Sequence, residues 1–135
     1  MCWKCFTCGG DVPEDDDVLP IDIAQLMRTF NDDIVFVVSI VRESLKEFRS
    51  QMDSITESLT RRDYDKIRTS AHNLMGSSAN ATCLSLAARA RDLEDYVINS
   101  KIDIPRINVL IARTQDEIER VTNCIESNSL FTADQ

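Results

Sequence analysis

Two groups of side chains in this 135-residue sequence could do chemistry: the one histidine, His72, and three N-terminal cysteines, Cys2, Cys5 and Cys8. A neutral imidazole is a good nucleophile near neutral pH. No motif of a hydrolytic triad accompanies His72. The sequence also shows no Walker-type glycine loop and no kinase motif that would bind ATP. Chemistry at His72 therefore requires a group that another protein delivers.

The three cysteines have the spacing of metal ligands, Cys2-x-x-Cys5-x-x-Cys8. A closed zinc site needs four ligands, and Asp11 or a second chain would have to supply the fourth. We therefore predict no metal site, and Cys2, Cys5 and Cys8 remain a partial ligand set for zinc or an iron–sulfur cluster. A metal- or redox-sensing function through these thiols is one hypothesis that the sequence leaves open.

A second interpretation of the same cysteines is S-palmitoylation, because they lie beside Trp3 and Phe6 and several acyl chains give stable anchoring. A third interpretation, which we favour, is a flexible tail with exposed thiols. The N-terminus lacks the layout of a signal peptide, so we expect a reducing compartment and interpret Cys83 and Cys124 as thiols. We expect a cytoplasmic or nucleocytoplasmic protein, which lipidation of the tail would bring to a membrane.

Charge and composition exclude several classes of protein. The 23 acidic and 15 basic side chains give a formal net charge of −8, which argues against binding to nucleic acid or to anionic membranes. The sequence contains only 3 glycines and 3 prolines, whereas 43% of its residues are hydrophobic. Turns must then be few, which disfavours an all-β sandwich or barrel and favours helices. No run of about 18 apolar residues is present, so we expect no transmembrane segment.

Apolar residues recur at alternating steps of three and four along most of the chain, the pattern of amphipathic helices. The predicted helices are a short one from Asp22 to Phe30, a long one capped by Asn31 with an inward stripe from Ile34 to Leu59, one over 64–81 capped by Asp63, and two over 83–99 and 104–126.

Four amphipathic helices joined by short links predict an all-α protein, an antiparallel up-down-up-down four-helix bundle. The short extra N-terminal helix would cover one end of this bundle. We expect three regions: a flexible tail that is rich in cysteine and acidic residues over 1–19, the bundle over 20–127, and a C-terminal tail over 128–135.

The predicted helix over 64–81 turns His72 away from the core. Its inner stripe centres on Ile67, Leu74 and Ser78. A step of about 100° per residue places His72 about 140° from Ile67. The imidazole is therefore expected on the surface, although a lone surface histidine most often has no role.

Small residues follow His72 on the same helix. Gly76 lies in mid-helix, where glycine costs about 1 kcal/mol relative to alanine, and Ser77 and Ala79 are also small. This cleared patch would let a large body approach the imidazole closely, which a small ligand would not need.

The segment from Ala71 to Asn80, A-H-N-L-M-G-S-S-A-N, resembles the signature of histidine-containing phosphotransfer (HPt) domains, which commonly read A-H-x-L-K-G-S-S-A-N. The flanking residues agree with this family, including Leu93 and Glu94 on the following helix. The resemblance covers residues 20 to 127 and extends to the number of helices and the place of the histidine on the second bundle helix.

The resemblance implies a phosphorelay intermediate in which His72 accepts a phosphoryl group from a receiver-domain aspartyl phosphate and passes it to another receiver aspartate. Gly76 would keep the approach open, with Ser77 and Ala79 beside it. The implied partners are receiver domains of a hybrid sensor histidine kinase and of response regulators, which would bring Mg²⁺. The chain would then be a monomeric phosphocarrier without a cofactor or kinase domain of its own, and not an enzyme.

The one departure from the ten-residue pattern is Met75, where the family usually has lysine. A lysine there could neutralise the charge of the incoming phosphoryl group, and methionine cannot. Arg68, one turn before His72, is the nearest substitute on the helical wheel, and Arg89 and Arg91 on the next helix are weaker candidates. Met75 therefore keeps an alternative open: an HPt-like docking module for a receiver or another signalling partner that is not phosphorylated.

Overall fold

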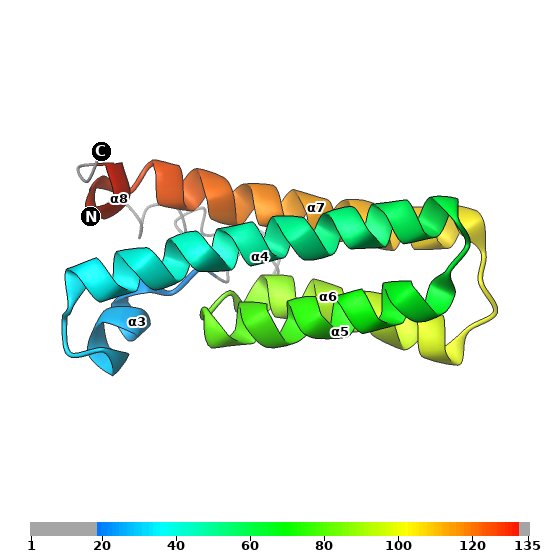
Figure 1. Cartoon of the computed structure of the whole chain (residues 1–135), viewed down its shortest axis with the longest axis horizontal. Coiled ribbons are helices and arrows are strands. Elements are labelled where there is room, and N and C mark those ends of the chain that lie inside the picture. The colour runs from blue at the N-terminus through cyan, green and yellow to red at the C-terminus, as the bar shows by residue number, and fades with distance from the viewer. Residues whose placement is uncertain (1–18, 133–135) are drawn as a thin grey trace, which may run out of the picture.

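The computed structural model describes residues 19–132, and each regular element in this range is a helix (Figure 1). The predicted tail with Cys2, Cys5 and Cys8 lies outside these residues. None of the helices within 19–132 combines the length and the apolar character that a membrane span requires. The helices are α3 (Ile23–Thr29), α4 (Ile34–Thr60), α5 (Tyr64–Asn80), α6 (Leu84–Asn99), α7 (Ile104–Glu126) and α8 (Ser129–Thr132).

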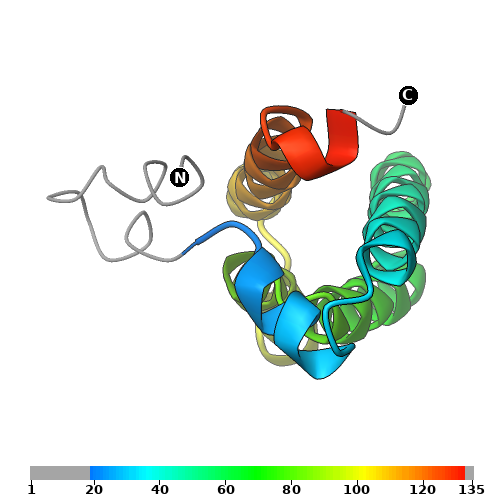
Figure 2. The same ribbon diagram turned by 90° about the vertical axis from the view of Figure 1, so that its left-hand side faces the viewer.

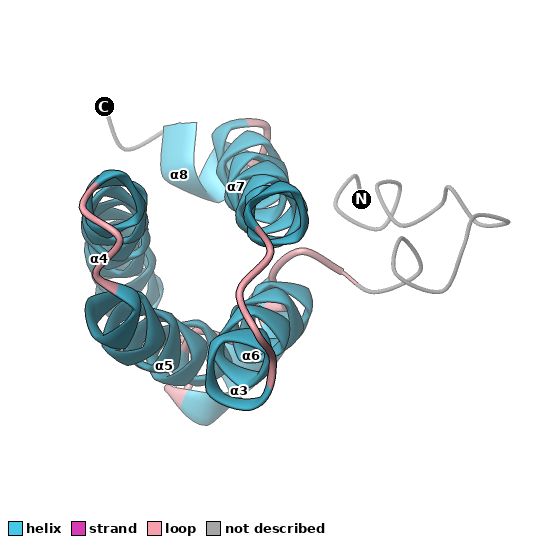
Figure 3. Ribbon diagram, turned by 90° about the vertical axis from the view of Figure 1, so that its right-hand side faces the viewer, coloured by secondary structure: helices cyan, strands magenta, loops and turns pink. Residues whose placement is uncertain are grey.

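The four long helices, α4 to α7, run side by side in alternating directions (Figure 1). The end-on view of Figure 3 shows them around one core, with α5 packed between α4 and α6. At the opposite end, which faces the viewer in Figure 2, α3 covers the bundle beside the turn that joins α5 to α6. The predicted all-α up-down-up-down bundle with a short N-terminal helix is confirmed.

Aspartate side chains begin three of the helices. Asp22, Asp33 and Asp63 accept hydrogen bonds from backbone N–H groups three residues further on, at 3.0–3.1 Å, which satisfies donors that a helix start leaves free. The predicted cap Asp63 is confirmed, whereas the predicted cap Asn31 is wrong. Asn31 and Asp32 both have positive φ, 57° and 61°, and they turn the chain so that Asp33 becomes the cap of α4.

The buried stripe of α5 agrees with the sequence pattern, because Ile67, Ala71, Leu74 and Ser78 are all buried. The expectation that Ile34 faces inward is wrong, because 46% of its surface is exposed. The first turns of α4 extend past the ends of α5 and α6 (Figure 1), so these helices do not cover Ile34 there.

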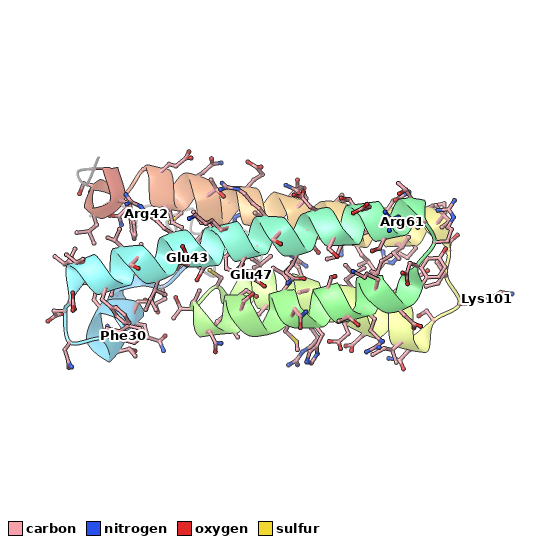
Figure 4. The ribbon with its side chains drawn as sticks, viewed as in Figure 1. Phe30, Arg42, Glu43, Glu47, Arg61 and Lys101 are labelled. Carbon is pink, nitrogen blue, oxygen red and sulfur yellow. The ribbon has the colours of Figure 1, made fainter. Side chains whose placement is uncertain are left out.

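The end of the described chain packs on the bundle. The sequence predicts a tail from residue 128, yet the described residues beyond it form α8, and Phe131 is buried. The Arg42 guanidinium donates to the Phe131 carbonyl at 3.1 Å, and Figure 4 shows Arg42 on α4 next to α8. The C-terminal segment thereby closes the end of the bundle between α4 and α7.

The turn between α5 and α6 is fastened to the start of α3 through Thr82. The Asp22 N–H donates to Thr82 Oγ1 at 3.0 Å, and this hydroxyl donates to the Asp22 carbonyl at 3.1 Å. Thr82 has a φ of 63°, a left-handed conformation that costs about 1–2 kcal/mol for a residue with a Cβ. The hydrogen bonds to Asp22 stabilise this conformation directly before Cys83, the N-cap of α6.

Candidate functional site

His72 lies on the outer face of α5, as predicted. Ala71 and Leu74, on either side of it along the chain, are both completely buried in the core. The His72 side chain is 60% exposed. Because one face of α5 must pack against α4 and α6, the register that buries Ala71 and Leu74 directs His72 to solvent.

A glutamate from the neighbouring helix holds the imidazole. Glu94 Oε2 of α6 lies 3.0 Å from Nδ1 of His72, and the Glu94 side chain is only 13% exposed. A carboxylate accepts hydrogen bonds and does not donate them, so we assign the ring proton to Nδ1. The lone pair of the neutral ring then resides on Nε2, which makes Nε2 the nucleophilic atom.

Glu94 would also stabilise the positive charge that the imidazole gains when it reacts. When Nε2 forms a bond to an electrophile, positive charge develops on the imidazole, and a carboxylate at Nδ1 stabilises that charge. The arrangement orients the ring at the same time, because the mostly buried Glu94 side chain has little freedom to move. A fixed carboxylate and an exposed Nε2 are the geometry expected of a nucleophilic histidine.

A groove of about 430 Å³ opens on the surface between α5 and α6 and reaches Gly76, one helical turn from His72. We call it the α5–α6 groove. An added Cβ at Gly76, four residues after His72 on the same face, would meet no atom within 4 Å. Small side chains therefore keep this surface open, as the sequence predicts. The groove is lined by Met75, Gly76, Ala79, Leu84, Ala87, Ala88, Arg91 and Asp92.

The structure separates the predicted supporting residues into two sets. Met75, Gly76 and Ala79 line the groove, and the half-buried Met75 also packs against the core. Ser77 and Arg68 are half-buried and do not line the groove. The Ser77 hydroxyl instead donates to the Asn73 carbonyl at 3.1 Å within its own helix.

Sequence reasoning did not assign Glu94 a role. On α6 it lies next to the fully buried Leu93, so the apolar pattern alone marks it only as a residue at the edge of the inward face. Its partner across the helix pair depends on the register of α6 against α5, which a single sequence does not specify. The nearest signal was its position in the flanking pattern of the family, 22 residues after His72.

The described cysteines do not line the α5–α6 groove. Cys83 and Cys124 are free and buried. Burial raises the pKa of the Cys83 thiol, and the nearby Glu117 and Cys124 raise it further. Within residues 19–132, no group of three or more His, Cys, Asp or Glu side chains is placed to hold a metal ion.

Comparison with known families matches the part of the chain that carries this site. The family model of the Hpt domain covers residues 39–124, which include His72, Glu94 and the α5–α6 groove. Searches of curated proteins and of solved structures find no match. Hpt domains are phosphotransfer modules of two-component signalling that interact with receiver domains, and they are neither kinases nor ATPases. Since the match covers more than half of its length, the chain belongs to the Hpt domain family.

Proposed function

We propose that this chain is a phosphorelay intermediate that carries a phosphoryl group on Nε2 of His72. The donor is the aspartyl phosphate of one receiver domain, and the acceptor is the aspartate of another. The observation that carries the proposal is the exposed imidazole whose Nδ1 is held by Glu94 at 3.0 Å. The family match supports the same class of chemistry.

Each transfer is a displacement at phosphorus. The Nε2 lone pair attacks the phosphoryl group, the bond from phosphorus to the aspartyl oxygen breaks, and that oxygen leaves as carboxylate. The Nδ1 proton stays on the ring, where Glu94 compensates the positive charge. In the second transfer, a receiver carboxylate attacks phosphorus and the bonding pair returns to Nε2. The protein's contribution is positioning and charge stabilisation, and the receiver would bring Mg²⁺.

The α5–α6 groove is the docking surface in this proposal. It begins at Gly76, one turn from His72, and reaches Leu84 at the start of α6. Leu84 is an exposed large apolar side chain, and together with the other apolar residues of the lining it makes a contiguous apolar surface. Contiguous exposed apolar surface marks places where proteins associate. A receiver that docks here would bring its aspartyl phosphate over Nε2.

The direct test is incubation of the chain with a phosphorylated receiver, followed by intact-mass measurement under alkaline conditions. We expect a gain of one phosphoryl group that acid removes, because phosphohistidine is acid-labile. A chain that binds the receiver and gains no mass would contradict the proposal. That result would favour the alternative of a docking module without phosphorylation, which Met75 at the usual lysine position keeps open.

A first prediction concerns Glu94. Glu94→Gln can still offer a carbonyl oxygen to the Nδ1 proton, so the substitution removes the charge and keeps the shape. Hydrogen bonds to charged groups contribute about 1.5–3 kcal/mol. The exposure of His72 places this pair at the lower end, so we expect phosphoryl uptake to slow about tenfold. Single-turnover transfer from a phosphorylated receiver measures the rate.

The matched control is Asp95→Asn, which removes an exposed carboxylate from the same helix. This control should transfer at the normal rate, and receiver binding should be unchanged in both variants. Equal transfer rates for Glu94→Gln and the unaltered protein would show that the carboxylate does not assist the reaction.

A further inference from the structure

We propose that Arg91 of α6 supplies the cation that neutralises the phosphoryl group on His72. This inference rests on the proposed function. In the family pattern a lysine at position 75 would play this role. Here we assign the role to Arg91, which lies on the opposite wall of the groove.

The need for such a cation follows from the charge of the group. A phosphoryl group carries nearly two negative charges near neutral pH, and the Glu94 carboxylate is already beside the ring. Met75 occupies the lysine position, is half-buried and packs against the core. Methionine has no charge to offer, so α5 leaves this position without a cation.

Two observations place Arg91 near the phosphoryl group that His72 would carry. It lines the α5–α6 groove together with Met75 and Gly76, and Gly76 lies one helical turn from His72. Arg91 also precedes Glu94 by three residues on α6, and residues three apart on a helix are neighbours with Cβ atoms about 5–6 Å apart. Glu94 in turn contacts the imidazole. His72, Gly76, Arg91 and Glu94 therefore occupy neighbouring positions across α5 and α6, and we refer to these positions as the cluster.

The state of the Arg91 side chain suits this role. Arg91 is exposed, and it makes no ion pair or side-chain hydrogen bond with the residues in the range 19–132. Its guanidinium can present two N–H groups to two phosphoryl oxygens at once. The surface over Gly76 is open, because an added Cβ there would meet no atom within 4 Å.

The other arginines considered from the sequence are less well placed. Arg68, the nearest on the helical wheel, is half-buried and does not line the groove. Arg89 is half-buried and is already engaged in an interaction. Asp92, the next residue of α6, also lines the groove, but its carboxylate would oppose an anion and cannot supply the cation.

The test compares Arg91→Ala with Arg113→Ala, an exposed arginine of α7 outside the groove. Both variants keep a good helix former on the surface, and circular dichroism checks the fold. We expect Arg91→Ala to slow phosphoryl uptake, or to shorten the lifetime of the phosphohistidine, by about threefold to tenfold. The difference should shrink as salt is added, because the site is exposed. Arg113→Ala should behave as the unaltered protein.

The double variant Met75→Lys/Arg91→Ala provides a readout that a structural role of Arg91 would not move. A lysine at position 75 would return a cation to the cluster from α5, so the double variant should recover most of the lost rate. Equal behaviour of Arg91→Ala and Arg113→Ala, with the unaltered protein labelled, would overturn the role of Arg91 and leave the proposed function intact. Failure of the unaltered protein to take up a phosphoryl group would overturn both.

Discussion

The variant His72→Gln is expected to lose all phosphoryl uptake while its helix content stays unchanged. Glutamine has no ring nitrogen to form the phosphoramidate bond, so no residual transfer at this position is expected. Its side-chain amide can still donate a hydrogen bond to Glu94. Because His72 is 60% exposed, its replacement opens no core cavity, and the free energy of unfolding should change by no more than about 0.5 kcal/mol.

Intact mass after incubation with a phosphorylated receiver measures the uptake, and circular dichroism during urea unfolding measures the stability. Asn73→Gln is a suitable control, since it places the same side chain at the next exposed position of α5. This control should be labelled normally. A folded His72→Gln protein that is still fully labelled would show that the acceptor is another residue.

Gly76→Gln is expected to slow transfer at least tenfold while the bundle becomes no less stable. Glutamine has a helix propensity about 0.5–1 kcal/mol better than glycine, and an added Cβ at position 76 meets no atom within 4 Å. The longer side chain would instead occupy the α5–α6 groove one turn from His72. A receiver could then no longer bring its aspartyl phosphate within reach of Nε2.

Gly76→Ala separates the two effects, because it gives the gain in helix propensity and fills little of the groove. We expect thermal unfolding temperatures to hold or rise in both variants, with a strong loss of transfer and of receiver binding in Gly76→Gln alone. A Gly76→Gln protein that transfers at the normal rate would contradict the assignment of this groove as the docking surface.

The sequence was sufficient for the fold because the helices are strongly periodic. The predicted helix over 104–126 matches α7 to the residue, and the predicted stripe of α5 is buried as a set. The outward direction of His72 follows from the same periodicity. In each case the information is local, since it depends only on which face of one helix is apolar.

Apart from the local error at the cap Asn31, the remaining errors concern contacts between segments that are distant in the sequence. The burial of Phe131 depends on where α7 ends and on the hydrogen bond from Arg42. The exposure of Ile34 depends on how far α4 extends past its neighbours. Glu94 contacts His72, and Arg91 lines the α5–α6 groove, because of the register between α5 and α6. A helical wheel compares positions on one helix only, so it favoured Arg68 over an arginine from the opposite groove wall.

Because Cys83 is buried, the reactivity of its thiol can be used to measure local opening of the turn between α5 and α6. Alkylating reagents attack the thiolate, and the raised pKa of the Cys83 thiol suppresses that form while the turn between α5 and α6 is closed. In a variant that keeps only this cysteine, the rate of alkylation therefore reports how often the turn opens. Cys83 is the residue directly before Leu84, at one end of the α5–α6 groove. A partner that binds only the closed form would slow the alkylation in proportion to its occupancy, so docking could be titrated without any phosphoryl transfer.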